Sequence, residues 1–265
     1  MLEDIKLKSE YYKKIIHPTV GADGNCTQTE YKVFMFFKAK KFEQIRPIIL
    51  SLIHQKELEK IDNTKYELAL KYIYNFFVCY TIIGEEKSNR LEDVVYKHAQ
   101  LLENEYSEEV LQEFASSLKR KIPGLEWFIN AFKNVGWSNY HDLYKGEKCK
   151  NRVKIILEVV EKHKSQNDSI NEFTIEHMLP DSENIENAQI GNLIPLEEPL
   201  NRRCSTKPLS EKYEIYRESN FASARGASAR YVGKEFNASQ RTEFLAKLIY
   251  NNILELNQLD FTIDT

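Results

Sequence analysis

The sequence predicts a mainly helical protein of the α+β class with one small β element. Apolar residues between about positions 28 and 164 recur close to every 3.6 residues, the spacing of amphipathic helices. Thr174–His177 and the residues from Asn192 onward are typical of two short strands, and a helix start that carries Asn201 follows them. Asn237 opens a capping-box pattern and a last helix to about residue 256.

The helical part divides into four clear amphipathic segments. They are Glu67–Ile83, Asn89–Tyr96, Ser107–Leu118 and Arg152–His163. A polar stretch, Ser165-Gln166-Asn167-Asp168-Ser169, follows the last of them and precedes the first strand. We therefore expect a helical domain over residues 1–165 and a second domain, with the strands and the final helix, over residues 166–265.

Composition limits the classes of protein. The chain has 265 residues, 42% hydrophobic and 29% charged, with a formal net charge of −3. It has no apolar run of membrane-spanning length and no signal-peptide features at its start, so a cytoplasmic protein is expected. Its four cysteines (Cys26, Cys79, Cys149 and Cys204) form no CxxC pair, which argues against a zinc ribbon and a disulfide scaffold.

The most informative stretch is Thr174-Ile175-Glu176-His177-Met178-Leu179-Pro180, where a carboxylate directly precedes a histidine. Hydrolysis of a phosphodiester benefits from a divalent ion that polarises the phosphoryl oxygen and from a base that takes a proton from water. Glu176 and Asn201 supply the oxygen ligands that Mg²⁺ prefers, and neutral His177 supplies the base. These residues predict a small metal-dependent nuclease site.

The same residues resemble a known family. Ile175 to Pro180, together with Ile190-Gly191-Asn192-Leu193 and Asn201, is similar to the HNH (ββα-metal) nuclease motif. More narrowly, it resembles the DUF1524 domain, the C-terminal half of GmrSD-type modification-dependent restriction enzymes. The resemblance implies a mainly α protein with a small ββα-metal (HNH) nuclease core. Lys212-Tyr213 and residues 236–256 stand where that family has a Lys/Tyr-bearing helix and a final helix.

The resemblance also implies roles for single residues. His177 would be the general base, and Glu176 and Asn201 would hold Mg²⁺ or Mn²⁺. Asn192 would brace the loop and orient the histidine, and Lys212 would contact a phosphate or the transition state. Two departures from the family are a short loop after the proline and a glutamate, rather than an aspartate, before the histidine.

A basic segment lies just downstream of the motif. Residues 201–234 carry eight Lys and Arg against Glu211, Glu214 and Glu218, and eight minus three gives +5. Positive charge beside a hydrolytic site fits a polyanionic substrate such as DNA. Ala222–Arg230 consists almost entirely of small residues and arginines, which predicts a flexible loop that orders on DNA. The expected nucleic-acid contacts are Arg202, Arg203, Lys207, Arg217, Arg225 and Arg230.

By resemblance, the biological role is restriction of foreign or modified DNA, a form of phage defence. The family's usual partner is a DUF262-type nucleotide-hydrolysing half, and nothing here matches it, so a fragment, a separate subunit and a stand-alone relative all stay open. A homodimer would allow both strands to be cut. Two alternatives remain: a non-catalytic nucleic-acid- or protein-binding module with the same fold, and a nuclease that acts on RNA.

Overall fold

The computed structural model describes residues 2–122, 124–167 and 169–258. They form two compact units, Met1–Ile122 with Leu254–Thr265, and Pro123–Ile253. The boundary expected at 165/166 lies inside the second unit, because helix α8 (Glu147–Ser165) packs against β2 and α11 of that unit. Of the polar stretch after α8, Asp168 lies outside the described residues.

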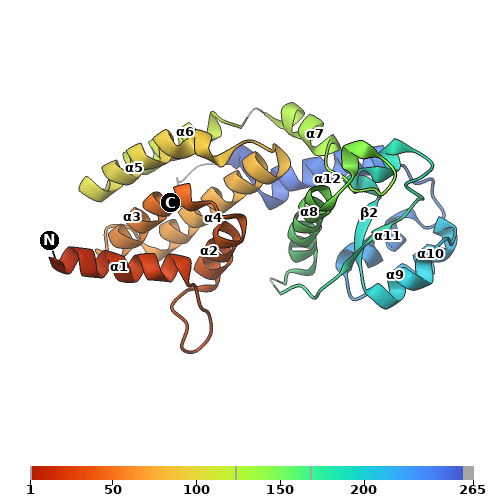
Figure 1. Ribbon diagram of the computed structural model, residues 1–265, viewed down its shortest axis with the longest axis horizontal. Coiled ribbons are helices and arrows are strands. Elements are labelled where there is room, and N and C mark those ends of the chain that lie inside the picture. Colours follow the sequence, from red (N-terminus) through yellow and green to blue (C-terminus); the bar gives the residue numbers. More distant parts are fainter. Residues whose placement is uncertain (1, 123, 168, 259–265) are drawn as a thin grey trace. The chain divides into compact units, whose positions relative to one another are not determined.

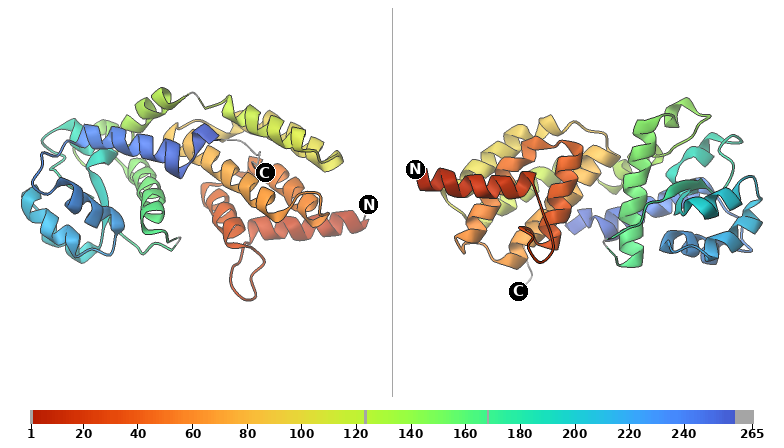
Figure 2. Two further views of the ribbon diagram at one scale, coloured as in Figure 1. Left: turned by 180° about the vertical axis from the view of Figure 1, so that it is seen from behind. Right: turned by 60° about the horizontal axis from the view of Figure 1, so that its bottom comes forward.

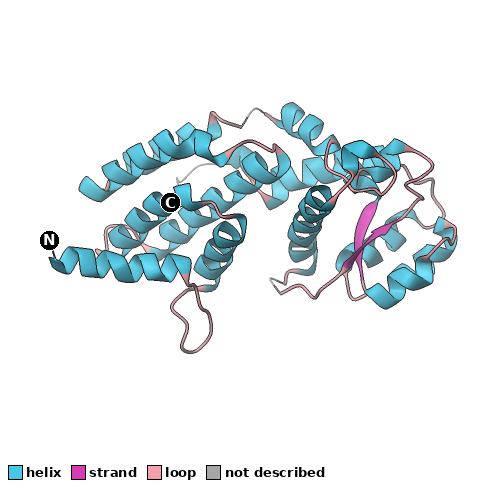
Figure 3. Ribbon diagram, in the orientation of Figure 1, coloured by secondary structure: helices cyan, strands magenta, loops and turns pink. Residues whose placement is uncertain are grey.

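The fold is mainly helical, as predicted. Figure 3 shows two short strands among helices, and the described residues contain twelve α-helices and one two-stranded sheet. None of the described helices combines the length and the apolar character needed to span a lipid bilayer.

Helices build the first unit. They are α1 (Leu2–Ile16), α2 (Gln28–Lys40), α3 (Arg46–Glu57), α4 (Asn63–Phe77), α5 (Glu92–Asn104) and α6 (Glu108–Lys119) (Figure 1). A full capping box starts α2, where Thr27 and Glu30 bond to each other's backbone N–H groups. The expected helix over 67–83 ends earlier, because α4 widens after Phe77 into a π-helical turn, Val78–Ile83. Large buried side chains such as Phe34, Tyr66 and Phe76 fill the core.

The second unit is built around a β-hairpin. Strands β1 (Thr174–His177) and β2 (Leu193–Leu196) pair antiparallel, with His177 opposite Leu193. Its helices are α7 (Leu125–Lys133), α8, α9 (Glu198–Cys204), α10 (Leu209–Arg217), α11 (Ala222–Tyr231) and α12 (Ala238–Leu248). Figures 1 and 2 show α8 on one side of the hairpin and α9 and α10 on the other. Both predicted strands, and the helix predicted after them, are therefore present.

The prediction of a flexible loop over Ala222–Arg230 is wrong. This segment forms α11, and the carboxylate of Glu161 on α8 accepts the N–H groups of Ala222 at 2.6 Å and Ser223 at 2.8 Å. A carboxylate at a helix N-terminus accepts hydrogen bonds from backbone N–H groups that have no partner within the helix. Its negative charge also interacts favourably with the positive end of the helix dipole. Alanine is the best helix former, and small side chains let α11 lie close to its neighbours, so one glycine does not unwind it.

Helix α12 closes over the start of β2. Its N-cap is Asn237, whose side chain accepts the N–H of Gln240. Gly191 lies directly under this helix, and a Cβ built there would be 2.0 Å from the carbonyl oxygen of Ala238. The Gly191 N–H donates to Thr242 Oγ1 at 3.0 Å. Only glycine permits this close approach, so the glycine of the Gly-Asn-Leu triplet is a packing requirement.

Candidate functional site

The acid–histidine pair ends strand β1, and the two side chains lie on opposite faces of it. Successive residues of a strand point to opposite sides. Glu176 is buried, with 5% of its surface exposed, against α10. The side chain of His177 is 17% exposed and lies against Trp137 and Asp181, which precede α8 and follow β1. The neighbours in sequence therefore belong to two different polar clusters.

Glu176 forms a buried ion pair. Its Oε1 accepts from Lys212 Nζ at 2.8 Å and from the Tyr216 hydroxyl at 3.0 Å, both on α10. Lys212 Nζ also donates to the backbone oxygen of His177 at 2.8 Å. Burial raises the pKa of Glu176 above its ordinary value, although the adjacent Lys212 opposes that rise. Lys212 was expected to contact a phosphate; its ammonium is instead buried, where it fixes the backbone at the catalytic candidate.

As folded, Glu176 does not fit a metal ligand. One carboxylate oxygen is already shared by an ammonium and a phenol, and little of the residue is exposed. A divalent ion needs open oxygen ligands and attached waters at this position. Across the described residues, no group of three or more His, Cys, Asp or Glu side chains could hold a metal ion. Glu176 bonds to Lys212 and Tyr216 while Asn201 bonds to Thr174, so the pairing of Glu176 and Asn201 as metal ligands stays a prediction.

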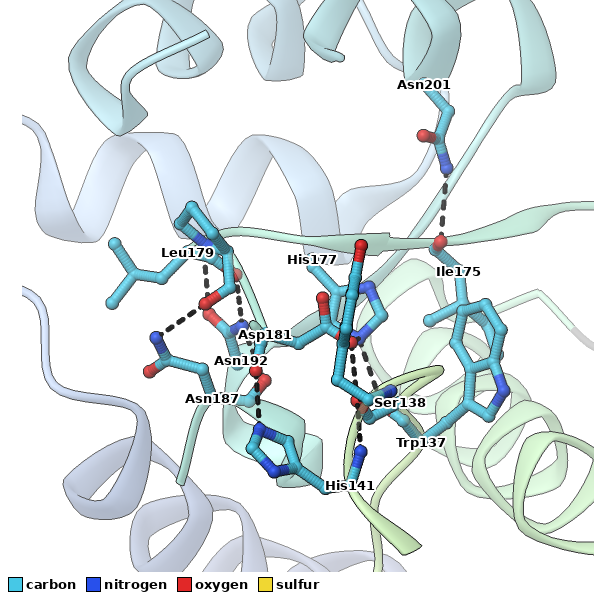
Figure 4. Close-up of polar contacts among 12 residues, drawn as sticks. Trp137, Ser138, His141, Ile175, His177, Leu179, Asp181, Asn187, Asn192 and Asn201 are labelled. Atoms are coloured by element: carbon cyan, nitrogen blue, oxygen red, sulfur yellow. Dashed lines mark hydrogen bonds and ion pairs between the residues drawn. The ribbon is translucent and has the colours of Figure 1, made fainter. Parts of the chain in front are cut away.

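Asn201 lies on α9 and contacts the other end of β1. Its Nδ2 donates to Thr174 Oγ1 at 2.8 Å and to the Ile175 carbonyl oxygen at 3.2 Å. These bonds tie α9 to the strand, and they leave the amide oxygen Oδ1 without a hydrogen bond among the described residues. Figure 4 shows this amide at Ile175, whereas the ring of His177 lies with Trp137 and Asp181.

The imidazole of His177 has a defined orientation. Nε2 lies 2.9 Å from the carbonyl oxygen of Trp137, and the ring packs on the Trp137 indole with centroids 5.3 Å apart. A carbonyl oxygen only accepts hydrogen bonds, so Nε2 carries the proton in the neutral ring. The lone pair then resides on Nδ1. This is the form of imidazole that takes a proton from water.

A carboxylate lies beside this ring. Asp181 Oδ2 is 3.7 Å from His177 Nε2, close enough to form an ion pair when the ring is protonated. Ser138 Oγ donates to the same carboxylate oxygen at 2.6 Å, and His141 Nε2 contacts the Asp181 backbone oxygen at 2.6 Å. Figure 4 shows these side chains gathered around His177. Asp181 thus sits where it stabilises a positive charge on the imidazole.

The Trp137 carbonyl is placed by a short backbone pairing. Gly136 and Gln189 form an isolated antiparallel bridge, and the Trp137 N–H donates to the Ala188 oxygen at 2.9 Å. A Cβ at Gly136 would be 2.2 Å from that same oxygen, so this position requires glycine. Residues about forty positions before the motif therefore complete the surroundings of His177. The sequence offered no periodic signal for this pairing, and His141 read as part of a polar loop.

Asn192 braces the turn that follows β1. Its Oδ1 accepts the Leu179 N–H at 2.8 Å, and its Nδ2 donates to the oxygens of Leu179 at 2.8 Å and Asn187 at 2.7 Å. The residue is fully buried. These three bonds hold the chain between His177 and Asp181, which is the bracing geometry expected for Asn192 from the motif.

The expected nucleic-acid contacts are exposed, and most are paired with nearby acids. Arg203 makes a two-point contact with Glu218 at 2.6 and 2.7 Å. Four further contacts are Arg202 with Glu198, Lys207 with Glu211, Arg217 with Glu214, and Arg225 with the Ser219 oxygen. Arg230 stacks on the Phe244 ring at 4.0 Å. Exposed ion pairs are weak, so these side chains can exchange a carboxylate for a phosphate.

Comparison with known proteins found a similarity within the second unit. Residues 136–248 match a family model of restriction endonuclease domains. The family is "GmrSD restriction endonucleases, C-terminal domain", and the matched segment is similar to it. The match begins at Gly136 and ends with α12, so it includes the Trp137 loop as well as the motif. The resemblance read from the motif is confirmed. No curated protein matches the chain.

Proposed function

We propose that this chain is an HNH-type endonuclease that hydrolyses DNA phosphodiester bonds in the restriction of foreign or modified DNA. The observation that carries the proposal is the orientation of His177, whose Nε2 faces the Trp137 oxygen and whose Nδ1 has no partner among the described residues. This geometry occurs within a segment that matches a restriction endonuclease family model.

The chemistry of the proposal uses the residues around His177. Nδ1 takes a proton from the attacking water, and the ring becomes a cation. Asp181, 3.7 Å from Nε2, stabilises that cation, and the Trp137 oxygen keeps the ring in place. Asn192 and Lys212 act as positioning residues. Asn192 bonds to the backbone of Leu179, just after the histidine, and Lys212 bonds to the backbone oxygen of His177 itself.

A divalent metal would polarise the phosphoryl oxygen and stabilise the leaving oxygen. That requirement rests on the family resemblance, since Glu176 as folded is closed to a metal. The substrate, DNA, is supported by the exposed basic residues of α9 to α11. The proposal also includes a cytoplasmic location, target recognition by a DUF262-type partner, and a homodimer for double-strand cleavage.

The test is cleavage of supercoiled plasmid by the purified chain with Mg²⁺, with Mn²⁺ and with EDTA. We expect nicking that requires a metal and is lost in His177→Ala. A matched RNA substrate separates a DNase from an RNase. Equal cleavage by His177→Ala and by the unmodified chain would refute the assignment of the base.

One observation favours a second candidate function, a non-catalytic nucleic-acid-binding module. The Glu176–Lys212 pair is the kind of buried structural contact that a fold keeps after losing its metal. This candidate predicts that the chain binds DNA with the same affinity in EDTA and in Mg²⁺. It also predicts that His177→Ala changes neither binding nor any other activity.

A further inference from the structure

A cavity in the second unit is lined by cationic side chains. It has a volume of about 430 Å³ and lies between the end of α8 and helices α11 and α12. Three cations line it, namely Lys164, Arg230 and Arg241, and two aromatic rings, Tyr231 and Phe244, form part of its wall. No acidic side chain is among the described residues that line it.

Arg241 lines this cationic cavity from α12. It is buried, with 6% of its surface exposed, and its Nη1 donates to the backbone oxygens of Gly191 at 2.6 Å and Leu193 at 3.2 Å. Both acceptors are neutral, and the other N–H groups of the guanidinium have no hydrogen-bond acceptor among the described residues. Burial lowers the pKa of Arg241 to about 10. A planar guanidinium with free donors suits an oxyanion.

Lys164 faces the same space without a partner of its own. It is half-buried, and within the described chain its ammonium has neither a hydrogen bond nor an ion pair. The nearest acid is Glu161, but both oxygens of that carboxylate accept N–H groups at the start of α11. Burial, together with repulsion from Arg241 and Arg230, lowers the pKa of Lys164 to about 8. Gly226 leaves room there, since its added Cβ would stand 3.9 Å from Nζ.

Arg230 completes the cluster at the surface. Its guanidinium stacks on Phe244 at 4.0 Å and lies 5.8 Å from the centre of the Tyr231 ring. This stacking holds the Arg230 guanidinium at the edge of the cavity. Among the described residues, no carboxylate forms an ion pair with it. Three cations that repel one another therefore share one cavity. Such a concentration of charge costs stability unless an anion enters.

We propose that this cavity is a phosphate-binding site, in which Lys164, Arg230 and Arg241 hold the phosphate group of a nucleic acid backbone or of a free nucleotide. The size suits a phosphate with its sugar, and Phe244 and Tyr231 offer apolar surface for the organic part. His177 does not line this cavity, although Arg230 is also one of the residues expected to contact DNA. If the phosphate belongs to DNA, the cavity holds the strand at a second point.

Binding is tested in the His177→Ala background, which prevents cleavage. The first probe is inorganic phosphate, with chloride at matched ionic strength as the reference, and thermal unfolding is the readout. The second is thymidine 5′-monophosphate, and the third is a fluorescent DNA duplex read by anisotropy. The variants are Lys164→Met and Arg230→Ala. The matched control is Lys162→Met, which removes one charge from the same helix at a position paired with Glu158.

We expect phosphate to raise the melting temperature of the parent and of Lys162→Met, and to lose that effect in Lys164→Met and Arg230→Ala. If the mononucleotide raises the melting temperature more than inorganic phosphate does, and DNA affinity does not change between the variants, the phosphate belongs to a free nucleotide. A tenfold loss of DNA affinity in Lys164→Met identifies the DNA backbone, with a salt slope reduced by about one. The proposal is overturned if neither phosphate nor DNA distinguishes Lys164→Met from Lys162→Met. Folding of each variant is checked by its unfolding transition without ligand.

Discussion

Replacement of Lys212 by methionine tests the buried ion pair at Glu176. Methionine keeps an unbranched apolar side chain but removes the ammonium that bonds to Glu176 Oε1 and to the His177 oxygen, both at 2.8 Å. Each side chain of the pair is only 6% exposed, so water does not replace the lost partner. Breaking a buried pair costs about 3–5 kcal/mol of unfolding free energy. That is a large part of a typical stability of about 5–15 kcal/mol.

The loss in Lys212→Met depends on pH with a definite sign. Burial raises the pKa of Glu176, so the folded state binds its proton more readily than the unfolded state. The stability contributed by this proton is present at low pH and is lost as the pH rises through the folded pKa. Removing Lys212 raises that pKa further. The deficit of Lys212→Met is therefore largest near neutral pH and shrinks as the pH falls to the range where Glu176 is protonated.

Urea unfolding followed by circular dichroism, at pH 7 and at pH 5, measures this effect. The control is Lys247→Met, which removes an exposed ammonium paired with Glu243 and should cost less than about 1 kcal/mol. The double variant Glu176→Gln/Lys212→Met removes both charges of this pair and should recover much of the loss. The reasoning is refuted if Lys212→Met is as stable as the control at pH 7.

Three further variants test the surroundings of His177. Asn192→Ala removes the hydrogen-bond partner of three backbone groups, one of them in a buried contact, and should cost about 1–3 kcal/mol by urea unfolding; Asn192→Ala with unchanged stability would contradict the bracing role. Asp181→Asn should slow plasmid nicking about 10–100-fold with little change in stability, and an unchanged rate would remove Asp181 from the mechanism. Gly191→Ala forces a Cβ to 2.0 Å from the Ala238 oxygen and should cost about 1–3 kcal/mol of stability; a melting temperature equal to that of the unmodified chain would show that α12 shifts freely.

Much of the fold follows from local patterns in the sequence. Helical periodicity located α4, α5, α6 and α8, and the acid–histidine and Gly-Asn-Leu segments located both strands. The prediction for Ala222–Arg230 was wrong because it used composition alone, which suggested flexibility. The N-terminus of the helix that forms there is capped by Glu161, a carboxylate about sixty residues earlier. A capping contact between residues so far apart in the sequence cannot be recognised from the residues of the helix and its immediate neighbours.

The candidate site was only partly predictable for a similar reason. The motif indicated His177 and Asn192, and the family match agrees with the motif. Treating Glu176 and His177 as one cluster overlooked strand geometry, which sends neighbouring side chains to opposite faces. The Trp137 oxygen and Asp181 reach His177 only in the folded chain, and Trp137 lies forty residues before the histidine in the sequence. Backbone groups carry no side-chain signal, so no sequence pattern could have indicated the first of these.

The central claim is that Nδ1 of His177 accepts the proton, and chemical rescue of plasmid nicking tests it most directly. Nicking by His177→Ala is measured with and without added imidazole, beside His17→Ala, which removes an exposed histidine of the first unit. We expect no nicking by His177→Ala alone, partial recovery with imidazole, and unchanged nicking by His17→Ala. Full nicking by His177→Ala without imidazole would contradict the claim.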